Sequence, residues 1–272
     1  MLTSNRPTLR LKLASGQALP VVWLSMGSVA IAEMAARSGA GAIVLDLQHG
    51  LWERRDVEAA IGIAQHHCPV MVRVAENSEA AISMALDAGA EGVIVPLVES
   101  ARQARAAVAA ARFPRTGSRS GGGVRPLQDF NGYFEWARDG VVVAVMIETA
   151  KGVRKARKIA RTEGLDMVFI GTGDLMISLG AFPDFNLDVM QACARVHRAC
   201  RQSYVPCGIF TPNAEMAAMR NGHGYRMVVV ANDIETVRRG FCDAVGRFGR
   251  DPATPPPAAG RELPTLPVPR QG

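Results

Sequence analysis

Eight short apolar runs recur between residues 20 and 231 of the chain. Each run is continuous and rich in β-branched residues, without alternation of apolar and polar positions, which is typical of parallel strands covered on both faces. The runs are Pro20–Leu24, Ala42–Asp46, Pro69–Val74, Gly92–Val98, Val141–Glu148, Met167–Gly171, Cys207–Phe210 and Arg226–Ala231. The pattern therefore predicts eight strands of a parallel sheet.

The stretches between these runs have alanine-rich, helical periodicity, as in Val57–Gln65, Glu79–Ala88 and Ala101–Arg112. Glycines such as Gly39 and Gly89 follow helical patterns directly before a strand. Glycine accepts the left-handed conformation that ends a helix. Eight strands that alternate with helices predict an α/β fold, a TIM-type (β/α)8 barrel, in preference to an open doubly wound sheet.

Length and composition indicate one folded domain followed by a tail. The chain has 272 residues, and 48% of them are hydrophobic, which is enough for a full core. Seven prolines fall in the last 24 residues, where apolar periodicity is lost. Such a segment cannot bury enough surface to offset its ordering entropy. We therefore predict a barrel domain over residues 1–248 and an extended or disordered tail over residues 249–272.

No apolar run approaches the roughly 20 residues that a membrane helix needs, and the N-terminus lacks a secretory signal pattern. The five cysteines form no C-x-x-C pair, which suits reduced thiols. These features predict a soluble, cytoplasmic protein without a membrane partner.

The net charge of +6 raises the question of a nucleic-acid partner, because clustered Lys and Arg side chains neutralise phosphates. The basic residues between Lys151 and Arg161, however, fall mostly on the exposed positions of one predicted helix and lack interleaved aromatic residues. A solvated helix face is the favoured interpretation, and no nucleic-acid partner is expected. The glycine-rich segment Ser118–Gly123 lacks a phosphate-loop pattern and is interpreted as a mobile loop over the barrel mouth.

Polar residues follow four of the predicted strands at their carboxyl ends, where an α/β barrel builds its active site. They are Asp46 and His49 after the second strand, Arg73 at the end of the third, Glu148 at the end of the fifth and Asp174 after the sixth. A carboxylate at the end of an apolar strand is costly unless it meets a cation or hydrogen-bond donors. The sequence therefore predicts a polar site on one rim.

Glu148 and Asp174 would supply hard oxygen ligands to a metal. Two carboxylates that leave room for water and substrate suit Mg²⁺ or Mn²⁺, with Co²⁺ as a further candidate, better than a tetrahedral zinc site. The alternative is that Glu148 pairs with a neighbouring arginine and Asp174 caps a helix that begins near Leu175.

His49 lies close enough to Asp46 for the carboxylate to orient its ring and raise its basicity; a local hydrogen bond is the alternative role. The planar fork of Arg73 could grip a carboxylate or keto oxygen; a surface ion pair is the alternative. Gly173 and Asp174 begin a predicted helix, where backbone N–H groups could hold a substrate carboxylate. The other four histidines are interpreted as structural.

Taken together and in order, these segments resemble the HpcH/HpaI aldolases, class II pyruvate aldolases that include 4-hydroxy-2-oxoheptanedioate and 2-dehydro-3-deoxyglucarate aldolases. The likeness covers roughly residues 21–248. Its signals are Leu45–Gly50, Pro69–Val74, Leu86–Ala90, Ala111–Pro114 with Gly117–Ser120, Met146–Thr149 and Phe169–Leu175. The resemblance implies a barrel of the phosphoenolpyruvate/pyruvate superfamily with a swapped C-terminal helix, so that Ile234–Phe248 packs on a partner chain in dimers or hexamers.

The resemblance also implies roles for single residues. Glu148 and Asp174 would bind the metal, and His49 with Asp46 would form the base dyad. Arg73 would contact the keto acid, and the amides of Gly173 and Asp174 would hold its carboxylate. Asp87 would reach the active site of a neighbouring subunit, and Phe210 would line the aldehyde pocket and restrict the acceptor.

The activity implied is reversible cleavage of a 4-hydroxy-2-oxo acid to pyruvate, or a pyruvate-like 2-oxo acid, and an aldehyde through a metal-stabilised enolate. No lysine stands at a predicted strand end, which disfavours a Schiff-base aldolase. One alternative is a carbon–carbon bond-forming synthase, such as a citrate-forming enzyme of siderophore biosynthesis that joins oxaloacetate and an acyl thioester. Another is a non-catalytic barrel that binds a small molecule or nucleic acid.

Two departures from the family pattern affect the surroundings of the site. Many members have Asp-Gly-Glu-His where this chain has Asp46-Leu47-Gln48-His49, and this change removes a negative charge beside the base. Many also have Gly-Pro-x-Asp where this chain has Gly171-Thr172-Gly173-Asp174, and the fixed φ of proline is lost there. Both departures leave the inferred base and ligands in place.

Overall fold

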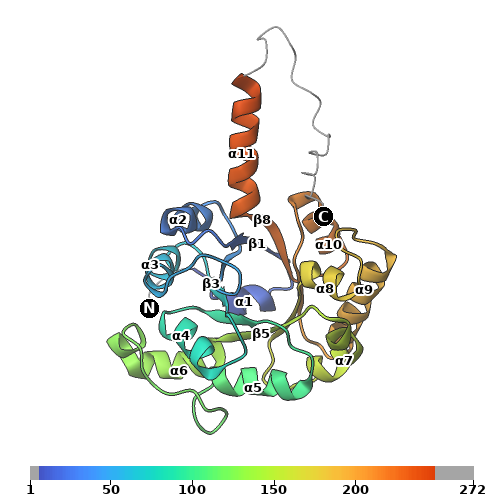
Figure 1. Ribbon diagram of the computed structural model, residues 1–272. Helices are drawn as coiled ribbons and strands as arrows, with labels where there is room; N and C mark the ends of the chain where they lie inside the picture. Colours follow the sequence, from blue (N-terminus) through green and yellow to red (C-terminus); the bar gives the residue numbers. More distant parts are fainter. Residues whose placement is uncertain (1–5, 249–272) are drawn as a thin grey trace, which may run out of the picture. The chain divides into compact units, whose positions relative to one another are not determined.

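The computed structural model describes residues 6–248, and eight parallel strands form a closed barrel in their order along the chain (Figure 1). The strands are β1 Leu19–Leu24, β2 Ala42–Asp46, β3 Val70–Arg73, β4 Gly92–Val95, β5 Val142–Ile147, β6 Met167–Ile170, β7 Cys207–Ile209 and β8 Met227–Asn232. All eight predicted strands and the closed barrel are confirmed. The register is interrupted by an irregularity between Val21 and Val22, where β1 pairs with β8.

Helices alternate with these strands. They are α1 Leu9–Ala14, α2 Val29–Arg37, α3 Arg54–Ala64, α4 Glu79–Asp87, α5 Ala101–Ala111, α6 Phe130–Gly140, α7 Ala150–Ala160, α8 Thr172–Ser178, α9 Leu187–Gln202, α10 Ala214–Gly222 and α11 Asp233–Phe248, with the 3-10 helix η1 Pro126–Asp129 before α6. Side-chain oxygens of Ser28, Ser78 and Ser100 cap helices that follow strands. Gly39 and Gly89 have positive φ beyond helix ends, as predicted. None of the described helices is long and apolar enough to cross a membrane.

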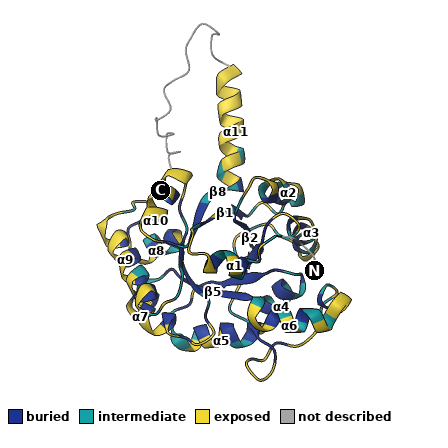
Figure 2. Cartoon of the chain, turned by 180° about the vertical axis from the view of Figure 1, so that it is seen from behind, coloured by how far each residue is buried: buried dark blue, intermediate teal, exposed yellow. Residues whose placement is uncertain are grey.

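The core has two layers, and the strands lie between them. On β5, Val142, Ala144 and Met146 belong to the cluster inside the barrel, whereas Val143 and Val145 pack under the helices. Successive side chains of a strand point to opposite faces, so a run buried on both sides must be apolar throughout. Figure 2 shows the resulting dark strands and the exposed outer faces of the surrounding helices. Leu9 and Leu13 of α1 belong to the inner cluster as well.

The glycine-rich segment Ser118–Gly123 lies between α5 and α6 and not at the barrel mouth. Just before it, Nη1 of Arg112 donates to the carbonyl oxygen of Val141, directly before β5, at 3.0 Å. Within the segment, Nη2 of Arg119 donates to Asp87 at the end of α4 and Oγ of Ser118 donates to Glu79 at its start, so the segment lies against the outside of this helix. The expectation of a loop over the mouth is wrong, because the segment follows a helix and helices run opposite to the strands.

The chain divides into two compact units, with the boundary between Thr236 and Val237 inside α11. The described part of the second unit is helical, and Phe241, Val245 and Phe248 are exposed on it. The predicted domain boundary after residue 248 stays a prediction, and the proline-rich tail lies outside the described residues.

Candidate active site

The carboxyl ends of neighbouring strands bring the predicted polar residues to one rim. Asp46 of β2 is paired in register with Arg73 of β3. Glu148 directly follows β5, and Asp174 lies in the first turn of α8, two residues into the helix that follows β6. Because β5 pairs with β6, the two carboxylates belong to adjacent strand ends.

Asp46 and Arg73 form a buried, two-pronged ion pair. Nε of Arg73 donates to Oδ1 of Asp46 at 2.8 Å, and Nη2 donates to Oδ2 at 2.5 Å. Trp23 Nε1 also donates to Oδ2, at 3.1 Å. Burial has the largest single effect on the pKa of Asp46 and raises it, but the hydrogen bonds and charge of Arg73, with the bond from Trp23, hold the pKa below its usual value. Asp46 is therefore an ionised group that fixes Arg73, which is not in a surface ion pair.

His49 stands at the rim with its side chain exposed to solvent. Its backbone N–H donates to Oδ1 of Asp46 at 3.2 Å, beside a similar bond from the N–H of Gln48 at 3.1 Å. Within residues 6–248 the ring of His49 has no hydrogen bond. Asp46 thus holds the backbone turn that carries His49 and does not contact its ring, and the predicted base dyad stays a prediction.

Glu148 has one satisfied and one unsatisfied carboxylate oxygen. Oε1 accepts from the backbone N–H of Leu97 at 2.7 Å, and Leu97 adopts a left-handed φ of 55° to present it. Oε2 is buried and has no hydrogen-bond partner among the described residues. A Cβ atom on Gly171 would lie 2.5 Å from Oε2, so glycine is required there.

Burial and the nearby Asp174 carboxylate raise the pKa of Glu148, and the Leu97 N–H and Arg73 oppose this shift; the net pKa is about 7. A cation against Oε2 would reverse this effect and restore the ionised form. The residues therefore fit a hard divalent cation. No cluster of three or more His, Cys, Asp or Glu side chains suited to a metal occurs in the described chain, so two carboxylates would leave the other positions to water and substrate.

The described residues show neither of the alternative roles of these carboxylates, a helix cap for Asp174 and an arginine pair for Glu148. The helix α8 begins at Thr172 after Gly171, so Asp174 lies inside the first turn and does not cap the helix. Within the described residues, no arginine forms an ion pair with Glu148.

Aromatic side chains lie beneath the rim. Two of them, Trp23 and Phe169, were not predicted as site residues from the sequence. The ring of Trp23 lies 5.7 Å from that of Phe169 and 5.5 Å, edge-on, from that of Phe210. The guanidinium of Arg73 lies 5.1 Å from the centre of the Trp23 ring. A tryptophan next to the last residue of β1 was the available signal. Phe210 directly follows β7, at the rim where a pocket residue is expected, although its role stays a prediction.

Asp87 is the one predicted site residue that the single chain does not bring to the rim. It ends α4, and its Oδ1 accepts from Nη2 of Arg119 at 2.7 Å. Arg119 is fully buried and stacks on Phe113 and Tyr133, with its guanidinium carbon 4.8 and 5.3 Å from the two ring centres. A catalytic role for Asp87 would therefore require a second subunit.

The barrel agrees with comparisons to known proteins. The sequence profile of the HpcH/HpaI aldolase/citrate lyase family matches residues 20–239. The chain belongs to this family. The predictions of the family and of an aldolase-type enzyme are thereby confirmed. Enzymes of the HpcH/HpaI family generally depend on a divalent metal ion.

Individual members of the HpcH/HpaI family are similar over most of their length. A hydroxypyruvate/pyruvate aldolase of Paraburkholderia phytofirmans is 33% identical, over 86% of this chain and 94% of the relative. The crystal structure of a family protein from Burkholderia cenocepacia superposes with a TM-score of 0.83 at 33% identity, over 88% of this chain and 98% of the other. The citrate synthase SbnG superposes with a TM-score of 0.80 at 26% identity, over 89% and 97%.

Proposed function

We propose that this HpcH/HpaI family member is a divalent-metal-dependent aldolase that reversibly cleaves a 4-hydroxy-2-oxo acid to pyruvate, or a pyruvate-like 2-oxo acid, and an aldehyde. The observation that carries the proposal is the buried, unpartnered Oε2 of Glu148 beside Asp174, on the same rim as Arg73 and His49. The similarity to a hydroxypyruvate/pyruvate aldolase supports pyruvate as the product.

Glu148 and Asp174 would hold Mg²⁺, Mn²⁺ or Co²⁺. When bound, the cation supplies Lewis acidity toward the oxygens of the 2-oxo acid. Arg73 would donate to the keto oxygen as negative charge develops there. Asp46 occupies Nε and Nη2 of Arg73, whereas Nη1 has only a weak contact of 4.0 Å with Sδ of Met146. Nη1 is therefore available to the substrate. The bonds from Nε and Nη2 to Asp46 fix the orientation of the guanidinium group.

His49 would move the proton of the reaction. In cleavage its imidazole accepts the proton of the hydroxyl group that becomes the aldehyde oxygen, while the adjacent carbon–carbon bond breaks and its electron pair passes to the 2-oxo acid fragment, which takes up a proton from water to give pyruvate. In the reverse direction these transfers are reversed. Its ring is exposed to solvent and is therefore accessible to a substrate. The amides of Gly173 and Asp174 would hold the substrate carboxylate, and Phe210 would favour an apolar or narrow aldehyde.

The metal assignment is tested by measuring bound metal together with pyruvate release from a panel of 4-hydroxy-2-oxo acids. Chelator treatment should abolish turnover, and Mg²⁺ or Mn²⁺ should restore it. Glu148→Gln should lose both metal and activity. Glu99→Gln is the matched control, because Glu99 lies near the same strand ends but is bonded to Lys151 and Thr149. Full activity after chelation, or in Glu148→Gln, would overturn the metal assignment.

The role of His49 has a separate test. His49→Ala should lose pyruvate release while it keeps the metal content and the stability of the parent protein. Loss of the metal in this variant would instead make His49 a ligand.

A second candidate function is carbon–carbon bond formation from oxaloacetate and an acyl thioester, as in a citrate-forming synthase. The similarity to the citrate synthase SbnG favours it. The two functions are distinguished by offering oxaloacetate with an acetyl thioester and following release of the free thiol. Thiol release without any aldol cleavage would favour the synthase.

The assembly and the cellular location belong to the same proposal. A homo-oligomer, dimeric or hexameric, would cover the exposed Phe241, Val245 and Phe248 of α11 and give Asp87 a neighbouring rim to reach. Light scattering should give a multiple of the chain mass, and Phe241→Asp should reduce it.

All five cysteines are free, which agrees with the reducing conditions of the cytoplasm, where we place the protein.

A further inference from the structure

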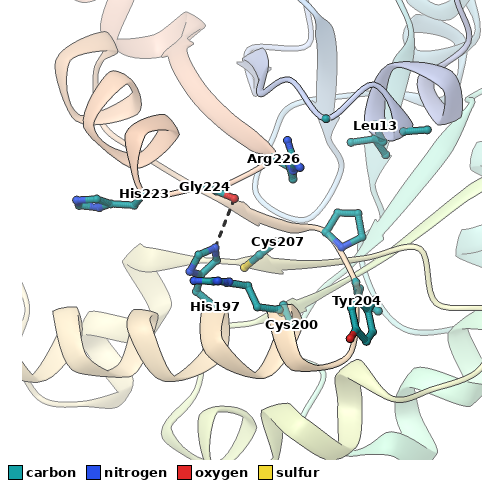
Figure 3. Close-up of a pocket in the computed structure, with 13 residues that line it drawn as sticks. Leu13, His197, Cys200, Tyr204, Cys207, His223, Gly224 and Arg226 are labelled. Carbon is teal, nitrogen blue, oxygen red and sulfur yellow. Dashed lines mark hydrogen bonds between the residues drawn. The ribbon is translucent and has the colours of Figure 1, made fainter.

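A cavity of about 480 Å³ opens at the amino-terminal end of the barrel, and none of the predicted site residues lines it (Figure 3). Its lining includes Cys207, which begins β7, and Arg226, which directly precedes β8. The active-site candidates lie at the opposite, carboxyl ends of the strands. The cavity therefore belongs to a different part of the barrel from the proposed aldolase site.

The lining of this cavity is basic. His197 and Arg201 reach it from α9, His223 from the C-cap of α10 and Arg226 from the position before β8. No Asp or Glu side chain lines it. In the described part of the chain, neither the Arg201 nor the Arg226 guanidinium forms an ion pair or a hydrogen bond. A guanidinium group at a cavity wall without a protein acceptor is available to an anion.

Other arginines at this end of the barrel are neutralised. Arg10 and Arg112 share the carboxylate of Asp166, at 2.7 and 3.0 Å. Arg6 pairs with Glu91. The positive charge of the cavity is therefore a local property of Arg201 and Arg226 and not a general feature of this end of the barrel.

The net charge around the cavity favours an anion, although two helix carboxyl ends nearby carry partial negative charge. The carboxyl ends of α9 and α10 each contribute roughly half a negative charge, against two full positive charges from Arg201 and Arg226. Burial lowers the pKa of His197; the Gly224 carbonyl opposes this, and the charges of Arg201 and His223 lower the pKa further. His197 is therefore neutral at pH 7, and the arginines supply the charge.

The cavity is also held open and has one apolar wall. The ring of His197 stacks on Tyr225 with centroids 4.4 Å apart, and its Nε2 lies 3.4 Å from the carbonyl oxygen of Gly224. Beside the Arg226 guanidinium, a Cβ atom on Gly16 would lie 3.6 Å from Nη1, so this glycine leaves space next to the charge. Leu13, Val205 and Pro206 supply apolar surface.

We propose that this cavity is a second ligand site, which binds a small molecule with a carboxylate or phosphate group and a short apolar body. Arg226 and Arg201 hold the oxyanion, and the body lies against Leu13, Val205 and Pro206. The site does not depend on the aldolase chemistry proposed for the opposite rim.

Calorimetric titration of the full-length, metal-loaded protein tests the proposal, with phenyl phosphate and benzoate as probes and neutral benzamide as the reference. One of the two anions should bind at least tenfold more tightly than benzamide, and the stronger identifies the headgroup. Arg226→Gln should weaken that binding about tenfold and Arg201→Gln several-fold. Arg226→Lys keeps the positive charge but loses the planar, two-pronged guanidinium group. Its affinity for the anion should lie between those of the parent protein and Arg226→Gln.

Arg198→Gln is the matched control, because Arg198 is an exposed arginine of the same helix α9 that does not line the cavity. It should change the affinity less than twofold. Glu148→Gln, which alters the opposite rim, should leave the affinity unchanged. Equal weakening by Arg198→Gln, loss of binding in Glu148→Gln, or binding of benzamide as tight as that of the anions would overturn the proposal. Unchanged melting temperatures would show that the arginine variants are folded.

Discussion

Replacing Arg73 by methionine should destabilise the protein by about 3–5 kcal/mol, because it leaves the Asp46 carboxylate buried without its cation. The side chains of Arg73 and Asp46 are only 9% and 3% exposed, so water cannot compensate. Methionine keeps much of the side-chain volume, so most of the loss reports the charge and not a cavity. Asp46 would keep its bonds from Trp23 and from two backbone N–H groups, which sets the lower end of the range.

The measurement is urea unfolding of the parent protein, of Arg73→Met, of Asp46→Asn and of the double variant, followed by circular dichroism. The double variant should be more stable than the sum of the two single changes predicts, because it buries no unpaired charge. Lowering the pH below about 3.8, the usual pKa of an aspartate, should cost the parent protein the stability that ionised Asp46 contributes. In Arg73→Met, burial without the arginine raises the pKa of Asp46 relative to the parent protein, so acidification should reduce the penalty of the unpaired carboxylate. A destabilisation under 1 kcal/mol, or strict additivity in the double variant, would refute the reasoning.

Four further outcomes are expected. The metal-free pKa of Glu148 is about 7, so below pH 7 a cation must displace a proton from this carboxyl group. The Mn²⁺ affinity measured by calorimetry should therefore fall about tenfold per pH unit between pH 7 and 6 and level off above pH 8. An affinity that does not change with pH would contradict this. In the metal-free protein the pKa is raised above 4.5, so the unfolding free energy should decrease as the pH rises from 4.5 through 7. Gly171→Ala should weaken Mn²⁺ binding at least tenfold, because the new methyl group would displace Oε2 of Glu148. Gly222→Ala is the control and should leave Mn²⁺ binding unchanged, because Gly222 has open space around it. Equal effects of the two changes would refute the steric argument. Arg119→Met should destabilise the protein by roughly 1–3 kcal/mol in urea unfolding, since Asp87 loses its charged donor, and a neutral effect would argue against this pair as a structural element.

The barrel could be predicted because its signals are local. A strand buried on both faces must be apolar at every position, so β5 and β6 are visible as runs, and glycines past helix ends mark the turns between elements. The rim residues follow from the same pattern, because the carboxyl ends of parallel strands meet at one edge. Glu148 and Asp174 were found in this way, as residues that interrupt or follow apolar runs.

The partners of these residues could not be predicted, because they depend on contacts between distant parts of the chain. The sequence suggested that Asp46 orients the nearby ring of His49. In the structure Asp46 meets Arg73 from the next strand, 27 residues away, together with Trp23 from β1. The register between β2 and β3 decides this pairing, and register is a property of the assembled sheet.

By itself, the sequence determined the number of strands, the end of the barrel that carries the polar residues, and the carboxylates available to a metal, since each of these depends on which residue types occur within one short segment. Only the tertiary structure decided that Glu148 keeps one buried oxygen without a partner, that the glycine-rich segment lies away from the mouth, and that Arg201 and Arg226 share a cavity free of acidic groups. These features arise where segments far apart in the chain pack together, because burial, hydrogen bonding and net charge at a point are sums over all the segments that meet there.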